Sequence, residues 1–311
     1  MSDQPGRHRR ADLLFRRFTA LMSALILLLG AGILLRLALG SGPAFREFGL
    51  RFLVSRDWDP YRDLYGALPF IWGTIYTSLL ALFFALPLSL GIAVFLAELA
   101  PGWLRAPVSV VIELLAAIPS VIYGLWGMFV FAPFMMNHVQ PFLGARLGFL
   151  PLFTGYPLGV GILTASLVLA VMIIPTISAI SREILVTVPE TQKEAALALG
   201  MTRWETIRRV IIPYGRSGVF GAVVLGYGRA LGETMAVTML IGNTPTLSAS
   251  LFSPGYTIAS VIATEFAEAF STLYISSLIQ LGLVLFLITL LINVCARLLL
   301  RRMGRFDAGA A

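Results

Sequence analysis

Six long apolar stretches recur along this 311-residue chain, and they constrain its fold more than any other feature. A helix rises about 1.5 Å per residue, so about 20 apolar residues cross the hydrocarbon core of a bilayer. The chain is 58% hydrophobic and 13% charged, whereas soluble globular proteins rarely exceed about 50% apolar residues. An all-α polytopic membrane protein is therefore predicted. The predicted spans are Phe18–Leu39, Leu68–Leu96, Pro107–Phe131, Pro157–Ile180, Val219–Ile241 and Ile275–Leu299.

The distribution of basic residues orients these spans. With a cytoplasmic N-terminus, 16 arginine and lysine residues lie inside and five lie outside, as the positive-inside rule requires. Six spans then place both termini in the cytoplasm. The first span is predicted to be an uncleaved anchor, because no small-residue cleavage site follows before Arg36. The net charge of +7 indicates lipid contact on one membrane face rather than a nucleic-acid partner.

This topology divides the chain into four segments. A cytoplasmic basic tail (1–17) precedes the first span and a periplasmic loop (18–67). The membrane core (68–300) contains a cytoplasmic loop at 182–217, and a second cytoplasmic tail (301–311) ends the chain. Cys295 is the only cysteine, and His8 and His138 lie far apart. We therefore predict no disulfide and no metal site.

Three prolines lie inside predicted spans: Pro87, Pro119 and Pro175. A proline inside a helix frees a backbone carbonyl and bends the helix. Such breaks are tolerated in a bilayer where neighbouring helices or a water-filled cavity satisfy the freed groups. The three prolines are therefore either hinges along a translocation path or ordinary packing kinks, and periodicity does not separate these alternatives.

The longest polar inside segment contains two helix-start signals. Thr187–Glu190 and Thr202–Glu205 each read T-x-x-E, the pattern of a capping box. Gly200 is expected to end the first helix in the left-handed conformation, and Pro213 is expected to end the second. The segment thus predicts two short helices that do not span the membrane. Either they lie on anionic lipid as an amphipathic pair, or a partner protein holds them.

The spacing within this loop resembles a known family. Glu194-Ala195-Ala196, Gly200 and Pro213 match the EAA loop of permease subunits of binding-protein-dependent ABC importers, with Val210 and Ile212 as conservative departures. The resemblance implies a type I ABC importer permease fold, in which this loop is the coupling helix. It also implies that these five residues couple the chain to an ATP-hydrolysing subunit.

No nucleotide-binding motif accompanies the loop. A phosphate-binding P-loop needs G-x-x-x-x-G-K-[ST], but the only lysine is Lys193, which follows Gln192. The chain is therefore predicted to be no enzyme by itself and to bind no cofactor. ATP would be bound by the partner subunit, and the assembled complex would be an ATP-hydrolysing translocase.

The fifth predicted span contains two charged residues, Arg229 and Glu233. A charge in the middle of a span costs about 2.5–3.5 kcal/mol on insertion scales. A spacing of four places both on one helical face, where they would partly neutralise each other as a structural ion pair. However, a buried ion pair is often no more stabilising than apolar residues. We therefore favour an anion site: Arg229 contacts the anion, and Glu233 holds Arg229 when the path is empty or accepts a hydrogen bond from HPO4²⁻.

The amino-acid sequences of three segments point to a narrower family. Residues 229–243 (RALGETMAVTMLIGN), 116–133 and 65–82 are similar to the PstC family of phosphate importer permeases. This resemblance implies a phosphate transport role for Arg229 and Glu233. It further implies a PstA-like second permease subunit, a PstB-like ATPase dimer and a PstS-like periplasmic phosphate-binding protein, with the chain in a bacterial plasma (inner) membrane. The alternatives are an importer of another oxyanion (sulfate, molybdate or phosphonate) and, from a different class, a stand-alone channel or secondary transporter.

The outer segment Asn243–Ser271 contains no lysine or arginine and carries Glu265 and Glu268 beside apolar residues. This pattern is typical of a short helix lying at the membrane surface. A solvated loop is the default interpretation of such a segment, and the short surface helix is the alternative.

Overall fold

The computed structural model describes the backbone of residues 5–308 and the side chains of residues 12–300. Arg7, Arg9 and Arg10 of the predicted basic tail and Arg301, Arg302 and Arg305 of the other tail lie outside the described side chains. The described part contains no β-strand. Its elements are α1 (Pro5–Gly40), α2 (Gly42–Phe48), α3 (Arg51–Val54), α4 (Leu68–Val94), η1 (Phe95–Leu99), α5 (Gly102–Ala117), α6 (Ser120–Trp126), η2 (Gly127–Phe131), α7 (Ala132–Phe134), η3 (Met135–Val139), α8 (Gln140–Leu147), η4 (Pro151–Phe153), α9 (Ile162–Val186), α10 (Glu190–Ala198), α11 (Arg203–Thr206), η5 (Ile207–Ile211), α12 (Ile212–Gly232), α13 (Met235–Leu240), α14 (Ile258–Glu265) and α15 (Thr272–Ala308).

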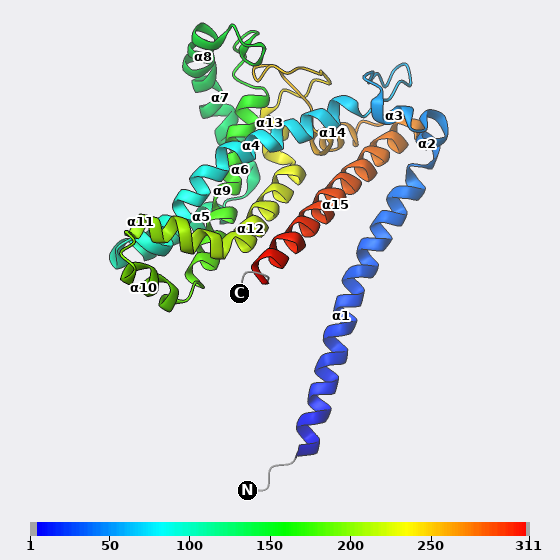
Figure 1. Cartoon of the computed structure of the whole chain (residues 1–311). Coiled ribbons are helices and arrows are strands. Elements are labelled where there is room, and N and C mark those ends of the chain that lie inside the picture. Colours follow the sequence, from blue (N-terminus) through cyan, green and yellow to red (C-terminus); the bar gives the residue numbers. More distant parts are fainter. Residues whose placement is uncertain (1–4, 309–311) are drawn as a thin grey trace.

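Six helical segments are long and apolar enough to cross a membrane, which confirms the predicted all-α architecture. In Figure 1, α10 and α11 lie at the same end of the molecule as the beginning of α1 and the end of α15, whereas α2, α3 and α8 lie at the opposite end. Helix α1 therefore begins and α15 ends on the side of the α10–α11 loop, the side that the basic residues assign to the cytoplasm. The six spans cover residues 12–40, 68–99, 120–147, 162–186, 203–232 and 272–300.

The centre of the fold is α9, in which 72% of the most apolar stretch is buried in the protein. It packs most extensively against α4 and α12. Gly226 allows the close approach of α12, because a methyl group there would lie 2.4 Å from Cγ1 of Ile177 on α9. By contrast, α1 projects away from the other helices and contacts mainly α15 (Figure 1). The α4–α9–α12 core therefore carries Thr176 and Arg229, which are considered below.

The third span differs from its prediction at Pro107–Phe131. Helix α5 ends at Ala117, Ile118 and Pro119 adopt extended backbone angles, and the span begins afresh at Ser120 and continues to Leu147. The residue before a proline is disfavoured in the α region, so the helix breaks at this point. Among the three predicted hinges, Pro119 thus interrupts its helix, whereas Pro87 and Pro175 lie inside continuous helices.

The fifth span is also displaced, from the predicted Val219–Ile241 to Arg203–Gly232. Pro213 does not end the second helix of the loop, as predicted, but lies in the first turn of α12. A π-helical turn (η5) precedes it, in which the Ile212 N–H donates to the Ile207 carbonyl. A wider turn of this kind accommodates a residue that lacks an N–H. The second loop helix therefore runs on into the membrane.

The outer segment contains a short helix, α14, rather than only the solvated loop of the default interpretation, and the first turn of this helix is buried in the protein rather than lying on the surface. Its first turn, Ile258–Val261, is buried and packs on α4, α13 and α15. Thr257 and Ser260 form a capping box at its N-terminus.

Glu265 ends α14 at a point where three aromatic donors converge. Its Oε2 accepts hydrogen bonds from Trp58 Nε1 at 2.8 Å and Tyr274 Oη at 2.6 Å, and its Oε1 accepts one from Tyr256 Oη at 3.2 Å. Burial raises the pKa of Tyr256 to about 12, so this hydroxyl stays protonated and remains a donor. The carboxylate thus ties three separate segments together on the outer side.

We expect Glu265→Ala to lower the free energy of unfolding by about 2–4 kcal/mol, because three partly buried donors lose their acceptor. Thermal unfolding of the purified protein in detergent measures this change. Glu268→Ala is the matched control: Glu268 is exposed, so the change should stay within about 0.5 kcal/mol. Equal midpoints for the two variants would contradict the role of Glu265.

Candidate functional site

Arg229 lies in the last turn of α12 with its side chain exposed. Its Nη1 donates to Thr176 Oγ1 at 3.1 Å. Thr176 follows Pro175 in α9 and lies ten residues before the end of that helix at Val186. Ten residues of helix measure about 15 Å, which is too far for the arginine to reach the cytoplasmic interface. The exposed cation is therefore held at mid-depth along the membrane-spanning helices.

Glu233 is placed differently from the prediction. Helix α12 ends at Gly232, and Glu233 has extended backbone angles, φ −67° and ψ 127°. Its Oε1 accepts a hydrogen bond from the Ala236 N–H at 3.4 Å, in the first turn of α13. Among the described side chains, Arg229 and Glu233 form no ion pair with each other. The prediction that they share one helical face is wrong, because the helix ends between them.

The end of α12 itself favours the cation. The last carbonyls of a helix carry partial negative charge, which stabilises a basic side chain in the final turn. Arg229 therefore depends less on Glu233 for neutralisation than the sequence suggested. A guanidinium has five N–H donors in a planar fork, and Thr176 engages one terminal nitrogen. The remaining donors match the geometry of a carboxylate or a phosphate-like oxyanion.

The cytoplasmic loop has the predicted turn at Gly200. This residue has a φ of +85°, and its N–H donates to the Leu197 carbonyl at 2.9 Å. The Met201 N–H donates to the Ala196 carbonyl at 3.2 Å. These two bonds form a Schellman motif, which satisfies the last carbonyls of α10. The turn between α10 and α11 is thus fixed by a glycine-dependent conformation.

The capping predictions for the two loop helices have different outcomes. Thr202 and Glu205 form the expected reciprocal capping box at the start of α11. Thr187 does not cap α10: its hydroxyl donates to the Ile184 carbonyl at 2.7 Å, and Pro189 occupies the N-cap position. That prediction is wrong because α9 continues to Val186, so Thr187 belongs to the end of α9.

The loop exposes apolar side chains beside the EAA residues. Leu199 is 81% exposed and Trp204 is 61% exposed. Glu194 and Ala195 are exposed, whereas Ala196 is buried. Large apolar side chains next to an exposed acidic one are typical of a protein–protein contact.

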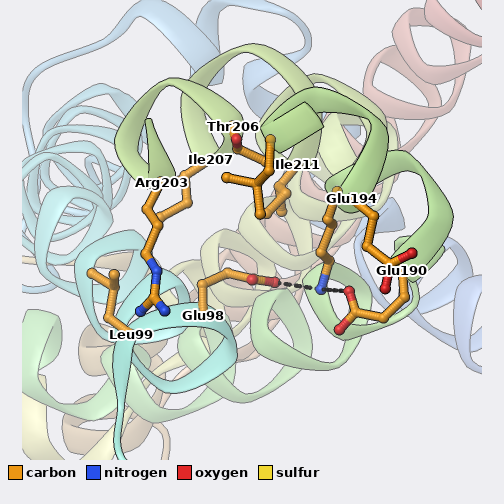
Figure 2. Close-up of a pocket in the computed structure, with 10 residues that line it drawn as sticks. Glu98, Leu99, Glu190, Glu194, Arg203, Thr206, Ile207 and Ile211 are labelled. Carbon is orange, nitrogen blue, oxygen red and sulfur yellow. Dashed lines mark hydrogen bonds and ion pairs between the residues drawn. The ribbon is translucent and has the colours of Figure 1, made fainter. Parts of the chain in front are cut away.

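Beneath the loop is a pocket of about 340 Å³ (Figure 2). Lys193 lies in it, with Nζ 2.9 Å from Glu98 Oε1 and 3.4 Å from Glu190 Oε2. Burial alone would lower the pKa of Lys193, but the two carboxylates outweigh burial and raise it, so the amine stays charged. Glu98 was not predicted to belong to this site, because it lies at the end of another span, far from the loop in the chain. The pocket is lined by Glu98, Leu99, Glu190, Lys193, Glu194, Leu197, Arg203, Thr206, Ile207 and Ile211.

Residues 89–305 match the family described as binding-protein-dependent transport system inner membrane component. The chain belongs to this family. This inner membrane component is 51% identical over 296 residues to the phosphate transport system permease protein PstC of Haemophilus influenzae, covering 94% of each chain. It is 40% identical over 266 residues to the probable phosphate transport system permease protein PstC of Methanocaldococcus jannaschii, covering 84% of each chain.

The fold of the inner membrane component is also similar to a solved structure. A chain of the MetNI methionine ABC transporter in inward-facing conformations aligns with a TM-score of 0.55 and 19% identity, covering 75% of this chain and 94% of that chain. At this identity the likeness concerns the fold alone. It confirms the ABC importer permease fold that the EAA loop implied.

Family membership determines the location and the general role of the chain. An inner membrane component of a binding-protein-dependent system is a transport subunit, and it works with an ATPase and a binding protein. It does not assign roles to individual residues. The roles predicted for Arg229, Glu233 and the EAA residues therefore rest on their positions in the fold.

Proposed function

We propose that this chain is the permease subunit of an ATP-driven importer of inorganic phosphate and forms half of the translocation path. Relatives with 40–51% identity over most of the chain are named phosphate transport permeases. The observation that carries the proposal is Arg229, an exposed cation at mid-depth whose side chain is held by a neutral threonine. A cation that is not neutralised by a neighbouring carboxylate can attract an anion into the membrane.

Within this proposal, Thr176 has the role that the sequence assigned to Glu233. The threonine hydroxyl orients Arg229 without neutralising its charge. When an oxyanion enters, Arg229 can replace this neutral hydrogen-bond acceptor with a charged one. Glu233 lies four residues beyond Arg229 at the helix break and remains on the proposed path. There its carboxylate would accept a hydrogen bond from a protonated anion such as HPO4²⁻, which sulfate cannot donate at neutral pH.

The energy is proposed to enter through the loop. A PstB-like ATPase dimer would bind ATP and contact α10. This chain would then need no cofactor of its own. A PstA-like permease would complete the path, and a PstS-like protein would deliver phosphate from the periplasmic side. The proposed coupling residues are Glu194, Ala195, Ala196, Gly200 and Pro213, and the proposed hinges are Pro87, Pro119 and Pro175.

Uptake of radiolabelled phosphate into proteoliposomes that contain the full complex tests this function. We expect uptake that requires both ATP and the binding protein, and that excess sulfate, molybdate or a phosphonate does not reduce. Equal competition by one of these anions would point to that oxyanion as the substrate. Uptake without the ATPase subunits would instead indicate a channel or a secondary transporter.

A further inference from the structure

We propose that the ion pair between Lys193 and Glu98 is the mechanical tie through which the loop and the membrane core move together. This inference rests on the proposed coupling of the loop to an ATPase, and it identifies the contact that transmits the movement. Lys193 is therefore assigned as a positioning residue, and Glu98 as its partner in the core.

The geometry of the pair separates it from ordinary surface ion pairs. The Lys193 and Glu98 side chains are each 14% exposed, whereas the second partner of Lys193, Glu190, is 75% exposed. Exposed ion pairs contribute little, but breaking a largely buried pair leaves an uncompensated charge. The Lys193–Glu98 contact is thus expected to hold the amine, and Glu190 is expected to contribute little.

The two partners belong to different parts of the fold. Lys193 lies on α10, immediately before the EAA residues, whereas Glu98 lies in η1, which continues α4 without a break. In Figure 2, the dashed contact to Glu98 joins the α10 segment to the end of the second span across the pocket, whereas the dashed contact to Glu190 lies within α10. A displacement of α10 that preserves the pair must therefore also displace the end of α4.

The movement of α4 can reach the candidate site through packing. Helix α4 packs against both α9 and α12, and Ser89 Oγ on α4 donates to the Ile174 carbonyl on α9 at 3.4 Å. Ile174 is two residues from Thr176, the partner of Arg229. A continuous chain of packed contacts of this kind can carry coupling free energy between the loop and the candidate site.

The test uses proteoliposomes that contain the full complex. Phosphate uptake, basal ATP hydrolysis and stimulation of hydrolysis by the binding protein are measured in the same vesicles. For Lys193→Met and for Glu98→Gln, we expect basal hydrolysis to be retained, while uptake per ATP and stimulation both fall about tenfold. Glu190→Gln should have a much smaller effect, and Glu183→Gln, at an exposed site on α9, is the matched control for loss of a carboxylate.

Exchanging the charges of Lys193 and Glu98 distinguishes a role in coupling from a merely structural role of the pair. The double variant Glu98→Lys with Lys193→Glu restores the pair with reversed polarity, and we expect it to recover coupling to within about threefold of wild type. Wild-type coupling in Lys193→Met, or a double variant no better than the single ones, would overturn the tie. If the wild-type complex moves no phosphate, the proposed substrate is wrong, and stimulation of hydrolysis by the binding protein still tests the tie.

Discussion

Arg229→Ala should reduce phosphate uptake about a hundredfold. The oxyanion would lose its charge-assisted hydrogen bonds at mid-depth, and a loss of about 3 kcal/mol corresponds to this factor. The change should not harm folding, because removing a charge from a span makes insertion easier by about 2.5–3.5 kcal/mol. Alanine also favours the helical turn in which Arg229 lies. Initial uptake rates in cells, normalised to the amount of the chain in the membrane, measure the effect.

Two further variants test how the neighbours of Arg229 contribute to phosphate uptake. Thr176→Val removes the hydroxyl that holds Arg229 but keeps the charge, so a smaller loss of about threefold to tenfold is expected. Glu233→Gln keeps the shape of the side chain and weakens it as an acceptor for a protonated anion. Uptake in Arg229→Ala within about threefold of wild type, at equal membrane levels, would remove Arg229 from the proposed path.

A second large effect is expected from Gly200→Val. The φ of +85° at this position is strongly unfavourable for a β-branched residue. The Schellman turn between α10 and α11 would be displaced, and the loop would no longer fit its partner. We therefore expect a loss of at least about tenfold in phosphate uptake and in ATP hydrolysis stimulated by the binding protein. Uptake and hydrolysis in reconstituted vesicles measure both effects.

Asparagine at the same position is the matched control. A Cβ at Gly200 would have no neighbouring atom within 4 Å, so the penalty comes from the backbone angle and not from a clash. Asparagine tolerates left-handed angles much better than valine, and Gly200→Asn should stay within about threefold of wild type. If the two variants lost equal activity, the backbone conformation would not be the reason for the glycine.

The loop shows what sequence reasoning can reach. The turn at Gly200 and the Thr202–Glu205 capping box were predictable because their hydrogen bonds join residues at most five positions apart. The prediction of a capping box at Thr187–Glu190 was wrong, although these residues match the T-x-x-E pattern as well as Thr202–Glu205 do. Its outcome depended on where α9 ends, which is decided by packing of α9 in the core rather than by the four residues themselves.

The fifth span shows where such reasoning fails. Hydropathy identified a span there, but it could not distinguish a helix that begins at Arg203 from one that begins at Val219. The π-helical turn before Pro213 and the break at Gly232 moved the span toward the loop. As a result Arg229 lies at a helix end, and Glu233 lies outside the helix.

By itself, the sequence determined the number of spans, the side that carries the loop and the left-handed turn within that loop. These features depend on composition, on charge distribution and on bonds between near neighbours in the chain. Only the tertiary structure decided that Thr176 holds Arg229 and that Glu98 holds Lys193. The partners are 53 and 95 residues apart, and no local pattern specifies which distant side chains come together when the α4–α9–α12 core packs.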